Sequence, residues 1–218
     1  MGHCQHLQVR QKIIGKISKL KIAAPWTEAY SQIDQFELSF DNKLTTLPIL
    51  PVQWKIIFDF MPVDVVTFDN PATSDIDWQT VANILMITNG DPDNCRIPSL
   101  FFSPVGGNSI LPVLKDQSYH IQPSEWIRHP SALNLNEWTK IEMRQEADED
   151  EDIIFTLSIN QVEKIRESNP DPKEFVNMDV YANDKWHNTG QPLFKLGFLR
   201  NMTILIRGGK ERISHKEL

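Results

Sequence analysis

Apolar and polar residues alternate with a period of two in several short segments of the chain. In residues 54–60 every second side chain is large and apolar, beginning with Trp54, whereas Lys55 and Asp59 face the opposite way. Residues 136–144 and 153–159 follow the same pattern. A period of two is typical of a β-strand with one buried face, so we predict a strand in each segment.

Further apolar runs are bounded by turn residues such as Asn89-Gly90 and Asn160-Gln161. These runs cover residues 82–88, 97–102, 110–114, 162–166, 175–181 and 198–206. Short strands that recur about every ten residues, with Gly, Pro and Asn between them, are typical of a β-sandwich or barrel. We therefore predict an all-β fold, an antiparallel β-sandwich formed by residues 26–218 as one domain.

Residues 1–25 differ from the rest of the chain because they carry five basic side chains and no acidic one. Val9, Ile13 and Ile17 recur at helical spacing, which would suit a basic amphipathic helix on an anionic membrane surface. Gly15 and the β-branched isoleucines disfavour a helix. We expect an N-terminal extension or first strand packed on the sandwich, with membrane binding as the alternative.

Charge and composition exclude several classes of protein. The formal net charge of −7 argues against a general nucleic-acid binder, which needs a basic surface to displace counterions. No apolar run approaches the roughly 18 residues of a transmembrane helix, so we expect no transmembrane segment. Cys4 and Cys95 fit no metal-binding spacing, and whether they pair is open.

The strings EWTKIEMRQ, IIFTLSINQVEKI, NPDPKEFVNMDVYAND and GFLRNMTILI follow one another between residues 137 and 206. Their order resembles the C-terminal half of laminin-G-like and other concanavalin-A-like jelly-roll domains. The resemblance implies a lectin-type jelly-roll sandwich and brings no family-wide catalytic residue with it.

The location of the protein is expected to be extracellular or in the secretory pathway. Residues 1–25 nevertheless lack the uninterrupted apolar core and cleavage site of a secretory signal. The terminal tetrapeptide at residues 215–218 resembles an endoplasmic-reticulum retrieval signal, but the lysine at its second position argues against recognition. Asn201 begins a glycosylation sequon, which we expect to be poorly accessible inside a strand.

Residues 146–151 match the E-x-D-x-x-E spacing of glycosidases that share this fold. The intervening positions should be apolar, yet six of the seven residues from 146 to 152 are acidic. Such a run repels itself and stays solvated. We therefore predict a mobile, exposed hairpin loop rather than a catalytic pair.

A turn after residue 88 supplies hard oxygen ligands of the kind that Ca²⁺ prefers. The predicted calcium ligands are Asn89, Asp91, Asp93 and Asn94. The alternative is an ordinary turn, because Asp and Asn also form turns through local hydrogen bonds.

A loop of about 16 residues joins the strands near 181 and 198, and long loops are often functional. It combines one indole ring with several hydrogen-bonding groups, which suits a sugar or a protein partner. The predicted ligand-binding residues are Asn183, Asp184, Trp186, His187 and Asn188. An indole folded over the sandwich edge is the alternative. We expect a non-catalytic module that binds a carbohydrate or a protein surface through these loops, with a glycan hydrolase on the same fold as the competing hypothesis.

Overall fold

The structure is a computed structural model that describes residues 24–39, 41–63, 82–91, 95–103, 109–115, 120–121, 133–183 and 197–208. All regular secondary structure in these ranges is β, which confirms the predicted all-β class. No helix in this part of the chain is long and apolar enough to cross a membrane. The prediction for residues 1–25 falls almost entirely outside the described residues.

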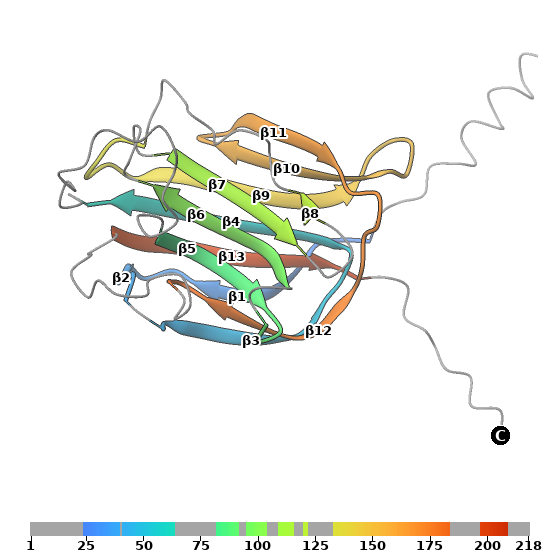
Figure 1. The fold of residues 1–218 in the computed structure, drawn as a ribbon, viewed down its shortest axis with the longest axis horizontal. Coiled ribbons are helices and arrows are strands. Elements are labelled where there is room, and N and C mark those ends of the chain that lie inside the picture. Colours follow the sequence, from blue (N-terminus) through green and yellow to red (C-terminus); the bar gives the residue numbers. More distant parts are fainter. Residues whose placement is uncertain are drawn as a thin grey trace, which may run out of the picture.

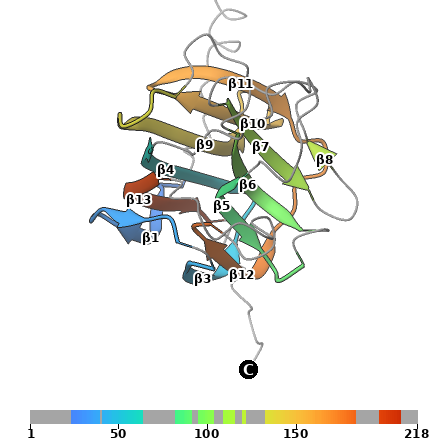
Figure 2. The same cartoon turned by 60° about the vertical axis from the view of Figure 1, so that its left-hand side comes forward.

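The strands form two antiparallel sheets that pack face to face (Figure 1). Sheet A has the order β1 (Thr27–Gln32), β13 (Gly197–Arg207), β4 (Gln53–Pro62), β9 (Thr139–Ala147), β10 (Ile153–Ile159) and β11 (Val162–Ser168), and β2 (Phe36–Glu37) also pairs with β13. Sheet B has the order β3 (Lys43–Leu50), β12 (Phe175–Tyr181), β5 (Ala82–Thr88), β6 (Arg96–Ser103), β7 (Ser109–Lys115) and β8 (His120–Ile121). The two sheets are also separate layers in Figure 2. The chain crosses between the sheets at β3, β4, β5, β9, β12 and β13, whereas β5–β8 and β9–β11 each continue within one sheet.

The predicted alternation decides which side chains enter the core. In β4, Trp54, Ile56, Phe58 and Phe60 are fully or almost fully buried, whereas the residues that alternate with them face out of the sandwich. Phe60 lies edge-on against Phe102 of sheet B, with 5.6 Å between the ring centroids. Trp54 contacts Phe155 within sheet A at 6.2 Å. Since burial of one such side chain contributes about 1.5–3 kcal/mol, this aromatic core fixes the outward face of sheet A.

A β-bulge in β13 changes one expectation from the sequence. The register with β4 shifts between Arg200 and Thr203, and Asn201 adopts a left-handed conformation there, with φ of 51°. The Asn201 side chain is exposed and donates a hydrogen bond to Asp59 at 2.8 Å. The prediction that the strand makes Asn201 inaccessible was wrong, because the bulge rotates it out of the ladder.

Candidate binding surface

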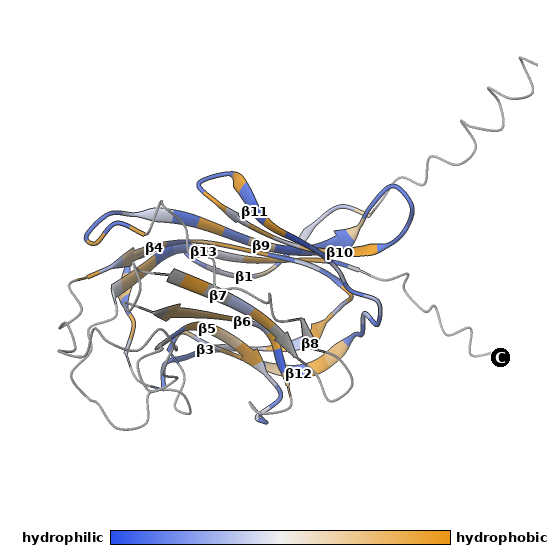
Figure 3. Ribbon diagram, turned by 45° about the horizontal axis from the view of Figure 1, so that its top comes forward, coloured by the Kyte–Doolittle hydropathy of each residue, from blue (hydrophilic) through white to orange (hydrophobic). Residues whose placement is uncertain are grey.

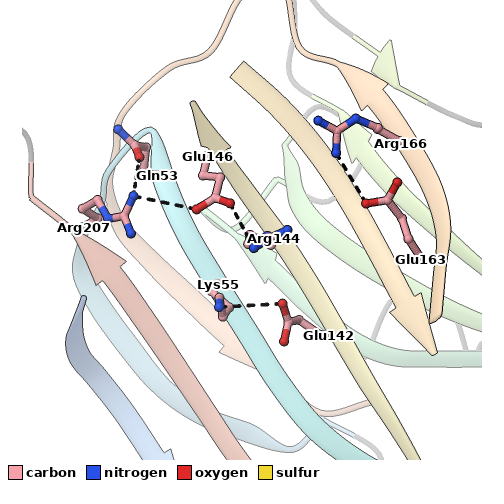
Figure 4. Close-up of polar contacts among 8 residues, drawn as sticks. All are labelled: Gln53, Lys55, Glu142, Arg144, Glu146, Glu163, Arg166 and Arg207. Atoms are coloured by element: carbon pink, nitrogen blue, oxygen red, sulfur yellow. Dashed lines mark hydrogen bonds and ion pairs between the residues drawn. The ribbon is translucent and has the colours of Figure 1, made fainter. Parts of the chain in front are cut away.

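The outward side chains of sheet A form a charged surface that extends from β13 to the edge strand β11. We name it the arginine face, and Figure 4 shows its residues. They are Gln53, Lys55, Glu142, Arg144, Glu146, Glu163, Arg166 and Arg207. They come from β4, β9, β11 and β13, at positions that alternate with core residues.

Strand register places three cations in one row across this face. Lys55 of β4 lies directly opposite Arg144 of β9, and Arg144 lies opposite Thr156 of β10. Thr156 in turn lies opposite Arg166 of β11. Like charges that face each other directly across a sheet repel and destabilise it. The row must therefore be balanced by carboxylates in the neighbouring rows.

Three glutamates supply that balance (Figure 4). Glu142 lies 3.7 Å from Lys55, and Glu163 lies 3.4 Å from Arg166. Glu146 is shared, because its two carboxylate oxygens lie 3.0 Å from Arg144 and 3.7 Å from Arg207. The guanidinium group of Arg207 also donates to Gln53 at 3.4 Å.

An indole ring covers one side of the arginine face. Trp26, just before β1, has Arg207 4.1 Å above its ring centroid and Lys55 at 5.4 Å. Both contacts have cation–π geometry, in which the negative ring face attracts the cation. Arg207 is consequently only 17% exposed, although it lies on the outer surface of the sheet.

A hollow of about 60 Å³ opens on the other side of Arg144. Its lining residues are Arg144, Glu146, Ala147, Asp148, Ile154, Thr156 and Arg166. Two guanidinium groups thus flank a hydroxyl group that forms part of the wall. Within the described part of the chain, the Nε atom of Arg144 is buried and has no hydrogen-bond partner. The hollow can hold about two water molecules or a polar group of similar size.

The structure confirms an exposed loop for residues 149–152 and corrects the placement of Glu146. Glu146 belongs to β9 and contacts two arginines, so its placement in an unpaired loop was wrong. Asp148 accepts hydrogen bonds from the backbone N–H groups of Asp150 and Asp152, both at 3.0 Å. The hydrophilic loop between β9 and β10 in Figure 3 is therefore a turn held by its own side chain. Glu146 and Glu151 lie in a strand and a loop, and do not form the strand-borne acid pair of a glycosidase.

The predicted calcium loop is described only in part. The side-chain oxygen of Asn89 accepts from the backbone N–H of Asp91 at 3.2 Å, and the carbonyl of Asp91 accepts from Cys95 at 2.8 Å. Asp93 and Asn94 lie outside the described residues. Among the residues that are described, no three His, Cys, Asp or Glu side chains form a metal-binding group. Calcium binding by this loop stays a prediction.

The predicted ligand loop lies mostly outside the described residues. Asp184, Trp186, His187 and Asn188 all fall in the undescribed stretch. Asn183 follows β12, is 3% exposed, and its carbonyl accepts from the backbone N–H of Asn42 at 3.2 Å. The role of this loop in binding therefore stays a prediction.

The sequence contained only part of the signal for the arginine face. Alternation identified Lys55, Glu142 and Arg144 as outward residues of their strands. The register that aligns Arg144 with Thr156 and Arg166 depends on pairing between strands, which no local pattern encodes.

No family model matches the chain. No curated protein matches it either. Among solved structures, the receptor-binding domain of botulinum neurotoxin D is 13% identical with a TM-score of 0.51, over 85% of this chain and 45% of that chain. The receptor-binding domain of botulinum neurotoxin type G is 16% identical with a TM-score of 0.48, over 85% and 43%. The alginate lyase Aly36B is 10% identical with a TM-score of 0.50, over 88% and 89%.

The chain thus spans less than half the length of the two toxin domains that it matches. At these identities the similarity shows the fold alone, and it confirms the predicted jelly-roll sandwich.

Proposed function

We propose that this chain is a non-catalytic carbohydrate-binding module whose ligand lies along the arginine face. The observation that carries the proposal is the convergence of Arg144 and Arg166 on one hollow beside Thr156. These groups offer fixed N–H donors and a hydroxyl that both donates and accepts. A sugar hydroxyl also donates and accepts, so it needs partners of both kinds when it is buried.

Hydrogen-bond acceptors and an aromatic ring lie near the hollow. Glu146 and Gln53 provide acceptor oxygens within the same face, and Trp26 provides an aromatic ring at its border. The Arg144 side chain is held by its ion pair with Glu146 at 3.0 Å, so it loses little conformational freedom when a ligand binds. This arrangement favours recognition of a hydroxylated ligand.

The charges of this face favour binding over hydrolysis. Glu142, Glu146 and Glu163 each face an ammonium or guanidinium group. In these ion pairs the glutamates act as counterions within the sheet, whereas a glycosidase presents a pair of carboxyl groups to the scissile bond. These glutamates therefore serve as hydrogen-bond acceptors and counterions in the proposal.

The alginate lyase Aly36B, which acts on the polysaccharide alginate, is one example of this fold in a glycan-acting protein. For the present chain, carbohydrate as the ligand remains our proposal. The loop with Trp186 is a second proposed contact region, as its sequence suggests.

A glycan array followed by a turnover assay tests this function. We expect retention of a set of oligosaccharides without release of shorter sugars, and weaker retention by Arg144→Gln. Release of products would support the hydrolase hypothesis instead. If no glycan is retained while the folded protein binds another protein, the carbohydrate proposal is wrong.

A further inference from the structure

The hollow of the arginine face combines two arginines with two carboxylates. Arg144 and Arg166 line it together with Glu146 and Asp148. The chain as a whole carries a formal net charge of −7, so arginines gathered at one hollow differ from the background charge. The preference of the hollow therefore depends on which of these four side chains retain hydrogen-bonding capacity.

The two arginines beside the hollow retain hydrogen-bonding capacity. A guanidinium group has five N–H donors. Arg144 uses Nη1 for Glu146, while its buried Nε has no partner within the described part of the chain. Arg166 is 54% exposed and has one long contact of 3.4 Å, to Glu163. Arg166 can therefore bind a planar anion through two parallel hydrogen bonds, and Arg144 can add a donor from its terminal nitrogens, because its Nε is buried.

The acids that line the hollow are already engaged. Glu146 contacts both Arg144 and Arg207, and the Asp148 carboxylate accepts two backbone hydrogen bonds from its own loop. An incoming anion thus meets one carboxylate that is paired with two arginines and one that is held by its own loop, beside the exposed guanidinium group of Arg166.

The cation row also explains why an anion would be favoured here. Lys55 and Arg144 repel each other because they lie directly opposite on β4 and β9. Arg144 and Arg166 are separated by one strand, a distance of about 10 Å between backbones that lie about 4.8 Å apart. An anion above this row reduces the repulsion and gains charge-assisted hydrogen bonds at the same time.

From these contacts we infer that the ligand is an acidic saccharide, whose carboxylate or sulfate group enters the hollow between Arg144 and Arg166. The inference rests on the proposed carbohydrate-binding function and specifies the class of sugar. A repeating acidic saccharide can place a further anion near Lys55, one strand away from Arg144.

Matched pairs of glycans that differ only in charge test the inference. Oligogalacturonates are compared with their methyl esters, and sulfated heparin-type oligosaccharides with their desulfated forms, by calorimetric titration of the whole chain. We expect at least one acidic glycan to bind tenfold or more tightly than its neutral counterpart. This advantage falls as sodium chloride is raised, because salt screens the charges.

The variant Arg166→Gln probes the site, since an exposed side chain on β11 is replaceable without loss of the fold. We expect tenfold weaker binding of the acidic glycan and unchanged binding of neutral glycans. Arg200→Gln is the matched control, because Arg200 is an ion-paired arginine on the same sheet but outside the arginine face. It should bind like the wild type.

The remaining outcomes separate the acidic class of the sugar from the carbohydrate-binding function itself. Equal binding of charged and neutral glycans, or no effect of Arg166→Gln on a glycan that binds, overturns the acidic class and leaves the carbohydrate function standing. Retention of no glycan at all overturns both. If polyglutamate binds in a way that depends on Arg166 and no glycan binds, the ligand is an acidic protein rather than a saccharide.

Discussion

Lys55 and Arg144 lie directly opposite each other on β4 and β9, so two cationic side chains meet on the outer face of sheet A. Opposed like charges destabilise a sheet, and this pair is tolerated because each cation contacts a glutamate in an adjacent row. Glu142 lies 3.7 Å from Lys55, and Glu146 lies 3.0 Å from Arg144. The stability of the sheet and the charge of the candidate site are therefore linked.

Replacement of Glu146 by Gln should destabilise the protein, because Arg144 and Arg207 then lose their shared counterion. The Glu146 side chain is 26% exposed, which places this ion pair between exposed and buried cases. We expect the free energy of unfolding to fall by about 1–2 kcal/mol, measured by urea denaturation. The exposed loop residue Glu149 is the control, and Glu149→Gln should change stability by less than about 0.5 kcal/mol. Equal effects of the two changes would show that Glu146 has no structural role.

Trp26 should stabilise the attachment of β1 to sheet A through its contacts with Arg207 and Lys55. Cation–π contacts contribute about 0.5–1 kcal/mol each at sites with solvent access. Trp26→Ala should therefore lower the free energy of unfolding by about 1–2 kcal/mol, while Trp26→Phe keeps a ring and loses less. If Phe and Ala are equally destabilising, the ring face does not interact with the cations as we describe.

Alternation along the sequence identifies the strands that have one apolar face and one charged face. β4 and β9 were predicted because large apolar residues alternate with charged ones. β1 and β3 were not predicted, since neither Thr27–Gln32 nor Lys43–Leu50 shows such alternation. Each of these two strands lies at the edge of its sheet, where pairing with one neighbour stabilises a sequence of weak intrinsic preference.

The candidate site was less predictable than the fold for a related reason. Arg207 lay one residue beyond the predicted end of its strand, and Glu146 was assigned to a loop because five of the next six residues are acidic. Ion pairing with Arg144 and Arg207 gives Glu146 a place in β9 that its local sequence does not indicate. Contacts between distant strands override local composition in both cases.

Calcium should raise the melting temperature if the loop of residues 89–94 binds it, because a ligand that binds only the folded state stabilises that state. The double change Asp91→Asn and Asp93→Asn should abolish the rise, which thermal unfolding in calcium and in chelator measures. A wild-type protein that melts at the same temperature in both solutions has no such site. The turn itself should survive, since the side chain of Asn89 still accepts a hydrogen bond from the backbone of residue 91.

Trp186→Ala should weaken ligand binding by about 1–3 kcal/mol, the range expected for loss of an aromatic anchor. The melting temperature should change little if the indole contacts the ligand. Titration with the best glycan of the array and a thermal melt measure the two quantities on the same sample. Unfolding of the variant would instead show that Trp186 packs against the sandwich, and the loop would then be structural.

Asp179 should make the stability of sheet B depend on pH in the acidic range. It lies on β12, where its carboxylate accepts from Thr46 at 2.7 Å and contacts the ammonium group of Lys43 at 2.8 Å. Burial raises the pKa of Asp179, but together the hydrogen bonds from Lys43 and Thr46 and the charge of Lys43 outweigh burial and hold it below the ordinary value of 3.8. The folded protein consequently binds fewer protons than the unfolded chain in the interval below that value.

This contribution to stability is complete above pH 3.8 and is lost as the pH falls through the lowered pKa of the folded state. Asp179→Asn should therefore be less stable than wild type at pH 7, and the difference should narrow as the solution is acidified below pH 3.8. Urea unfolding at neutral pH and at two acidic values measures it. The exposed Asp34→Asn variant is the control, and we expect it to differ little from wild type in stability. A difference for Asp179→Asn that stays constant with pH would mean that packing, and not the charge of the carboxylate, accounts for its effect.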